Sequence, residues 1–150
     1  MYPIDIGLTP NNGGKSIVGL PTWLWVDSPN ATQYRPASNK RVKSKCIRGT
    51  CVTVQGWVTK VAWNMGDGES FVCRNAGTKY KKRYGGDKSP NCGHFYDRDS
   101  DRQSGGKYRI RATTYWHWTW QGGGMSGTYD FTTDATRRLR IVEVEDVRVR

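Results

Sequence analysis

Few side chains in this 150-residue chain are of the types and spacings that carry catalysis. The two histidines, His94 and His117, have no nucleophile motif beside them, and no Gly-x-Ser-x-Gly sequence occurs. A general acid and a general base must lie within hydrogen-bond reach of the protons they move, and no pairing of carboxylates in the sequence suggests such a pair. We therefore expect a protein that is not an enzyme and needs no cofactor.

Three aspartates alternate along the sequence DRDSDRQSGG, at Asp97, Asp99 and Asp101. A calcium-binding loop begins with this spacing, but it also requires glycine at its sixth position and glutamate at its twelfth. Arg102 and Tyr108 occupy those two positions here. We expect a solvated loop and assign no metal ligands, with calcium binding left as the alternative.

A basic, aromatic segment is a stronger candidate for binding. The chain has 24 basic and 13 acidic residues, a net charge of +11, and such a charge attracts polyanions. In the sequence KYKKRY, four cations alternate with two tyrosines whose rings suit stacking on bases. An anionic cell-wall polymer such as teichoic acid, or a nucleic acid, is therefore one possible partner, and a solvated loop is the alternative. The candidate residues are Lys79, Tyr80, Lys81, Lys82, Arg83 and Tyr84.

Three tryptophans two residues apart, in the sequence YWHWTW, pose the choice between a core and a binding platform. Trp116, Trp118 and Trp120 share a strand face with the apolar Ile110, because alternate residues of a strand point the same way. This favours core packing for Trp116 and Trp118. The predicted strand is much longer than the typical 5–6 residues or so. Its end therefore projects as a hairpin around residues 122–124 and exposes Trp120, a candidate carbohydrate-binding side chain.

The four cysteines favour an oxidised, secreted protein. An even cysteine count in a Gly- and Thr-rich chain is typical of a disulfide framework. Proximity in the sequence favours the pairs Cys46–Cys51 and Cys73–Cys92 among the three possible pairings. Free thiols are an alternative, and so is a zinc site, although the spacings do not match the usual zinc knuckles. No apolar run is long enough to span a membrane.

Short strands separated by Gly- and Pro-rich turns are expected to position the candidate residues. This pattern predicts an all-β, immunoglobulin-like β-sandwich of about seven strands with long basic loops. Residues 1–18 form an extended N-terminal arm and residues 19–150 the sandwich in this prediction, with a loop over residues 30–45. A bulge is expected near Gln55 and another near Glu145, where the apolar alternation changes phase. Strands are expected within residues 19–29, 50–63, 70–73, 92–96, 107–120 and 137–150.

The sequence VAWNMGDGES, followed by GGKYRIRAT, resembles the polycystic-kidney-disease-type (PKD) domain. Asn64 and Met65 depart from the family's usual Asp and Phe, and the methionine fills the same apolar space. More closely, the chain looks like secreted actinobacterial proteins with LPTWLWV and WDMGDG motifs. The resemblance implies an immunoglobulin-like sandwich outside the cell, with no known catalysis. The matching positions are Trp63, Gly66, Asp67, Gly68, Gly106, Tyr108 and Ile110.

These observations favour a secreted or cell-surface binding or assembly module of a bacterial envelope. Its partner would be a protein or another copy of the chain, recognised through the edges of a sheet. A polyanion binder, a carbohydrate-binding module and a subunit of an extracellular filament are the alternatives. The N-terminal arm could add a strand to a neighbour, or it could be a flexible tail.

Overall fold

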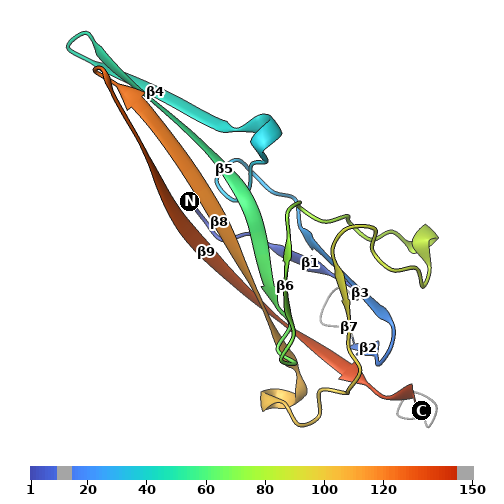
Figure 1. Ribbon diagram of the computed structural model, residues 1–150. Helices are drawn as coiled ribbons and strands as arrows, with labels where there is room; N and C mark the ends of the chain where they lie inside the picture. The colour runs from blue at the N-terminus through green and yellow to red at the C-terminus, as the bar shows by residue number, and fades with distance from the viewer. Residues whose placement is uncertain (10–14, 145–150) are drawn as a thin grey trace.

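The computed structural model of the chain describes residues 1–9 and 15–144, which form nine strands in two sheets packed as a sandwich (Figure 1). The smaller sheet has the order β1 (Ile6–Leu8), β3 (Pro21–Val26), β7 (Gly93–Phe95). The larger sheet has the order β2 (Lys15–Ile17), β9 (Met125–Val142), β8 (Tyr108–Gly122), β5 (Thr50–Asn64), β4 (Arg41–Ile47), with β6 (Ser70–Cys73) also paired to β5. The predicted all-β sandwich is therefore confirmed, with more strands than expected.

The N-terminal residues are extended, but they belong to the sandwich. β1 pairs antiparallel with β3, and β2 pairs in parallel with β9. Ile4 and Leu8 are buried in the core. The described part of the predicted arm is thus neither a free tail nor an unpaired strand, because its alternating apolar side chains are buried between the sheets.

Two sequence-based boundaries were wrong. Arg41–Ile47 is a strand, whereas residues 30–45 were expected to be a loop. Nearly every side chain of this strand is exposed, so no apolar alternation marks it in the sequence. The last strand begins at Met125, well before residue 137, and its distal half carries a polar, threonine-rich pattern. The bulge expected near Glu145 lies outside the described residues.

The predicted bulge in β5 is also displaced. The β5–β8 register shifts between Val58 and Lys60, and Gly56 stays in register opposite Trp118. The Trp118 ring lies over this glycine, since a Cβ at Gly56 would come within 2.4 Å of the indole. Gly56 therefore leaves space for a large ring on the neighbouring strand, and it does not break the pairing.

The GDG sequence forms the tight turn that was expected. Gly66 has a φ of 79°, and a Cβ there would lie 2.7 Å from the carbonyl oxygen of Arg109. The Asn64 side chain accepts the N–H of Gly66, and the Asp67 side chain accepts the N–H of Glu69, each at 3.0 Å. The positive φ of Gly66 and the two hydrogen bonds to backbone N–H groups both concern the backbone. The motif therefore stabilises the fold at this turn.

The ends of four strands continue past the smaller sheet (Figure 1). We call residues 41–58 and 113–134 of β4, β5, β8 and β9 the distal ribbon. Its two turns have positive φ at both central residues, 52° and 80° at Arg48 and Gly49, and 60° and 79° at Gly123 and Gly124. This is the requirement of the tight two-residue type I′ hairpin, whose twist matches that of its strands. The hairpin expected around residues 122–124 is thus confirmed.

Candidate functional site

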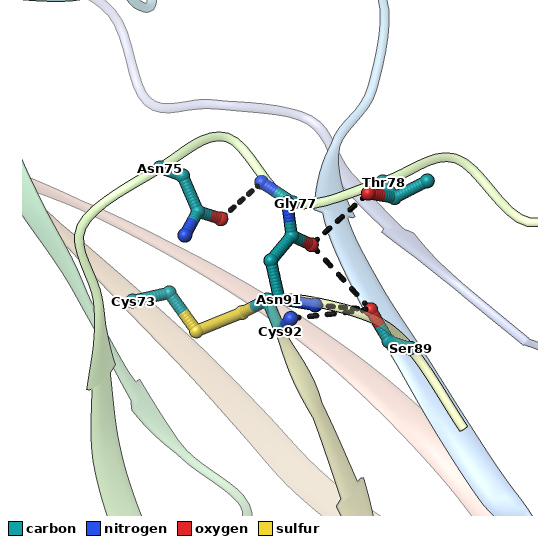
Figure 2. Close-up of a disulfide and its surroundings, with 7 residues drawn as sticks. All are labelled: Cys73, Asn75, Gly77, Thr78, Ser89, Asn91 and Cys92. Carbon is teal, nitrogen blue, oxygen red and sulfur yellow. Dashed lines mark hydrogen bonds between the residues drawn. A yellow bond between two sulfur atoms is a disulfide. The ribbon is translucent and has the colours of Figure 1, made fainter.

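All four cysteines are paired as their spacing favoured, Cys46 with Cys51 and Cys73 with Cys92. The second disulfide is buried and joins the end of β6 to the residue before β7, with 5.9 Å between its Cα atoms (Figure 2). Above it, the Ser89 hydroxyl accepts the N–H of Cys92 at 3.1 Å, and the Thr78 hydroxyl donates to the Asn91 carboxamide oxygen at 3.0 Å. This disulfide therefore fixes the base of the basic loop, residues 74–91.

The tyrosines of the basic loop pack on the fold. Tyr84 stacks on Trp23 at 5.0 Å between ring centroids, and Tyr80 meets the same indole edge-on at 5.3 Å. The Trp23 Nε1 donates to the carbonyl oxygen of Asp87 at 2.7 Å. Sequence reasoning missed Trp23, which lies far from the loop in the chain. Because both rings already contact Trp23, less of their surface remains for stacking on bases.

The basic side chains of the same loop are exposed to solvent. The side chains of Lys79, Lys81, Lys82 and Arg83 are exposed, and Lys79 approaches Asp27 at 3.9 Å. The Arg83 guanidinium donates to the Tyr84 hydroxyl at 3.2 Å, and this hydrogen bond lowers the pKa of the phenol. Salt-sensitive binding of a polyanion by these cations stays a prediction.

Trp116 and Trp118 pack in the core as predicted, whereas Trp120 is half-buried and not fully exposed. Trp116 and Trp118 are buried, with exposed fractions of 1% and 5%, and their rings stack at 5.8 Å. Trp120 is half-buried at the distal ribbon, and its indole lies over Gly127 of β9. One face of the Trp120 ring is therefore covered, so only a limited surface is open to a sugar.

A partly buried histidine–aspartate pair joins the GDG turn to β7. His94 Nε2 lies 2.7 Å from Asp67 Oδ2, with 12% and 10% of the two side chains exposed. Beside it, Tyr96 stacks on Tyr108 at 4.4 Å and donates to the carbonyl oxygen of Met65 at 2.7 Å. Burial, more than the nearby Asp67 charge, raises the pKa of Tyr96 far above its usual value. These contacts hold the turn against the smaller sheet.

A cavity lies next to this pair. It has a volume of about 460 Å³, and the described residues that line it include Asp97 and Arg98 but no serine, threonine or cysteine. In the part of the chain that the structure describes, no three His, Cys, Asp or Glu side chains converge as metal ligands. Asp99 accepts the N–H of Asp101 at 3.0 Å, so one carboxylate of the alternating series stabilises its own turn.

The distal ribbon has two open edges. The two residues that close a two-residue hairpin exchange both backbone hydrogen bonds, and beyond them hydrogen-bonded and non-bonded pairs alternate. Every second residue of each outer strand therefore directs its N–H and C=O away from the ribbon. Among the described residues, none of these groups bonds to the backbone of another segment. They belong to Val42, Ser44 and Cys46 on β4, and to Ser126, Thr128, Asp130, Thr132 and Asp134 on β9.

The two edges differ in charge. β4 carries Arg41, Lys43 and Lys45 and no acidic residue, whereas β9 from Met125 to Thr136 carries Asp130 and Asp134 and no basic residue. Asp134 accepts from the guanidinium of Arg111 on the neighbouring β8 at 2.9 Å, and this hydrogen bond lowers the pKa of the Asp134 carboxyl, which therefore stays ionised. Asp130 is held by His117 at 2.5 Å.

The face of the ribbon that carries the tryptophans exposes apolar side chains near the tip, beside Lys43 and Lys45 of β4. Ile47 and Met125 are 61% and 68% exposed, and Tyr129 is 48% exposed. The register places them on one face, because directly paired residues of neighbouring strands point the same way. The ribbon thus ends in two unpaired edges flanked by exposed apolar side chains. Binding through the edges of a sheet was predicted from the sequence without their location, and it stays a prediction.

Comparison of the chain with protein-family models, with curated proteins and with solved structures gave no match. Among the described residues, no helix is long and apolar enough to cross a membrane.

Proposed function

We propose that the protein is an extracellular, non-catalytic binding and assembly module that pairs a strand of a partner chain with an edge of its distal ribbon. One observation carries this proposal. Both edges of the ribbon present rows of backbone N–H and C=O groups that have no backbone partner within the described part of the chain. Strand addition uses such groups for affinity and the alternate side chains for specificity.

The two disulfides support a location outside the cytoplasm, because disulfides persist in oxidising compartments. The PKD-type resemblance of the GDG turn and the β8 sequence agrees with a secreted sandwich. Nothing in the fold requires Cys46–Cys51 for the core, since both residues are exposed at the tip of the ribbon. A disulfide there instead holds β4 against β5 and keeps the outer edge of β4 extended.

The edges of the distal ribbon suit a partner better than the other edges of the sandwich do. The strands of the smaller sheet are short, three residues for β1 and for β7. On β9, by contrast, β2 pairs only with Arg140–Val142, and no other strand among residues 1–9 and 15–144 pairs with the outer edge from Met125 to Leu139. An edge of that length can hold a partner strand of the usual 5–6 residues or so.

Site-specific photo-crosslinking tests this function. A benzophenone side chain at Val42 on β4 or at Thr132 on β9 is expected to crosslink a protein on the intact cells that produce the chain. The same group at Arg102, exposed in a loop of the sandwich body, is the matched control. Crosslinks from Arg102 that equal or exceed those from both ribbon positions would contradict the proposal.

A further inference from the structure

We infer that the partner strand comes from a second copy of this chain, so that the β4 edge of one copy pairs with the distal β9 edge of the next. This inference rests on the proposed function, and it adds which chain supplies the partner strand and which two edges meet. Three properties of the distal ribbon carry it: the charges of its edges, the direction and facing of its strands, and the position of its exposed apolar side chains.

The charges of the two ribbon edges favour a contact between unlike edges, β4 with β9. Neighbouring strands lie about 4.8 Å apart, so two β4 edges would bring Arg41, Lys43 and Lys45 of both copies together. Like charges placed opposite each other across an interface oppose association, and lysines on an edge strand are a known protection against such pairing. The β9 edge offers Asp130 and Asp134 and no cation between Met125 and Thr136. A β4–β9 contact therefore avoids this repulsion. The register places Arg41, Lys43 and Lys45 on the tryptophan face and Asp130 and Asp134 on the opposite face, so the two sets do not form direct ion pairs.

The strand directions fit the same contact. β4, β5, β8 and β9 are each antiparallel to the next, so β4 and β9 run in opposite directions on the two sides of the ribbon. Two copies placed side by side in the same orientation then meet through antiparallel strands. No rotation or refolding of either copy is needed to form the backbone hydrogen bonds.

The facing of the side chains is also consistent. Val42 and Ser44 direct their backbone groups outward from β4, and Asp130 and Thr132 do so from β9. Both sets have their side chains on the ribbon face opposite the tryptophans, by the same register. In any register that pairs outward-directed amides, the tryptophan faces of the two copies therefore form one continuous face.

The exposed apolar side chains lie where this contact would cover them. Ile47 stands at the end of β4, and Met125 and Tyr129 stand on β9, all on the tryptophan face. Pairing β4 with β9 of another copy brings Ile47 beside the strand that carries Met125 and Tyr129. This reduces exposed apolar surface that the isolated chain leaves to water.

A contact between two different edges leaves one free edge of each kind at the ends of the assembly. Such heterologous contacts continue into open filaments or close into rings. The contact therefore predicts growth beyond a dimer, whereas a contact between two identical edges would stop at two copies.

Proline at an outward-directed position tests the inference, because it removes the exposed N–H and leaves the inward hydrogen bonds in place. The Val42→Pro variant blocks β4, and Thr132→Pro blocks β9. In sedimentation velocity, the unmodified chain is expected to form oligomers larger than a dimer as its concentration rises. Each proline variant alone is expected to sediment as the 17.0 kDa monomer. An equimolar mixture is expected to form a 1:1 dimer and nothing larger.

Two results would overturn the inference. One is a dimer formed by either proline variant alone, which would reveal pairing of identical edges. The other is an unmodified chain that stays monomeric up to about 1 mM, the weak limit of specific association.

The two proposals fail in different ways. If the chain does not self-associate but Val42 still crosslinks to a different protein on cells, the edge binds a partner and self-assembly is wrong. If neither occurs, the proposed function is wrong as well.

Discussion

Replacing Trp116 with alanine is expected to lower the free energy of unfolding by about 3–5 kcal/mol, the usual cost of deleting a large buried aromatic side chain. Trp116 is 1% exposed and stacks on Trp118 at 5.8 Å and on Phe131 at 6.3 Å. Its removal leaves a cavity at the point where the ribbon enters the sandwich. Urea unfolding followed by tryptophan fluorescence measures the loss.

Trp120 provides the matched control two residues further along the same face. Its ring is half-buried, over Gly127, and lies outside the packed core. Trp120→Ala is therefore expected to cost about 1 kcal/mol, typical of a residue away from the core. Equal losses for the two substitutions would show that the outer part of the ribbon is as tightly packed as its base in the core, and the division between a packed base and a projecting tip would be wrong.

Removing the Cys73–Cys92 disulfide is expected to cost about 3 kcal/mol. The two cysteines are 19 residues apart, and the chain-entropy model predicts this loss for a loop of that length. Both side chains are buried, so alanine is the suitable replacement, because it leaves no hydroxyl group in the core. The unfolding midpoint of the Cys73→Ala, Cys92→Ala double variant in urea measures the effect.

The Cys46–Cys51 pair is the internal comparison. Its cysteines are only 5 residues apart and exposed at the tip, so the same model gives about 2 kcal/mol for Cys46→Ala with Cys51→Ala. If the disulfide keeps the outer edge of β4 extended, this variant should also lose oligomers in sedimentation at concentrations where the unmodified chain forms them. A larger stability loss at the tip than in the core would contradict this division of roles.

The core was predictable because its signals are local. The alternation around Trp116 and Trp118 indicated a strand with one apolar face, and that face is buried. Sequence proximity indicated both disulfides, since each closes a short segment. The GDG sequence indicated a turn because glycine there meets a backbone requirement, a positive φ at Gly66.

The candidate site was less predictable because it consists of strand edges and side chains that remain outside the core. β4 is exposed on both faces, so the sequence RVKSKCI has no apolar alternation to distinguish it from a loop. The opposite charges of β4 and β9 are visible in the sequence, but only the strand order places them at the two edges of one ribbon. The contact of Tyr80 and Tyr84 with Trp23 joins distant parts of the chain, and a local pattern cannot indicate it.

Residue-resolved amide hydrogen exchange tests the central claim, that the distal ribbon has open edges that pair with another chain. In the dilute, oxidised protein, the amides of Val42, Ser44 and Thr132 should exchange fast, while those of Lys43 and Phe131 should be protected. As the concentration rises, the fast amides of β4 and β9 should gain protection together. Protection of these amides already in the dilute monomer, or exchange that stays fast while the 79–84 loop becomes protected, would contradict the account.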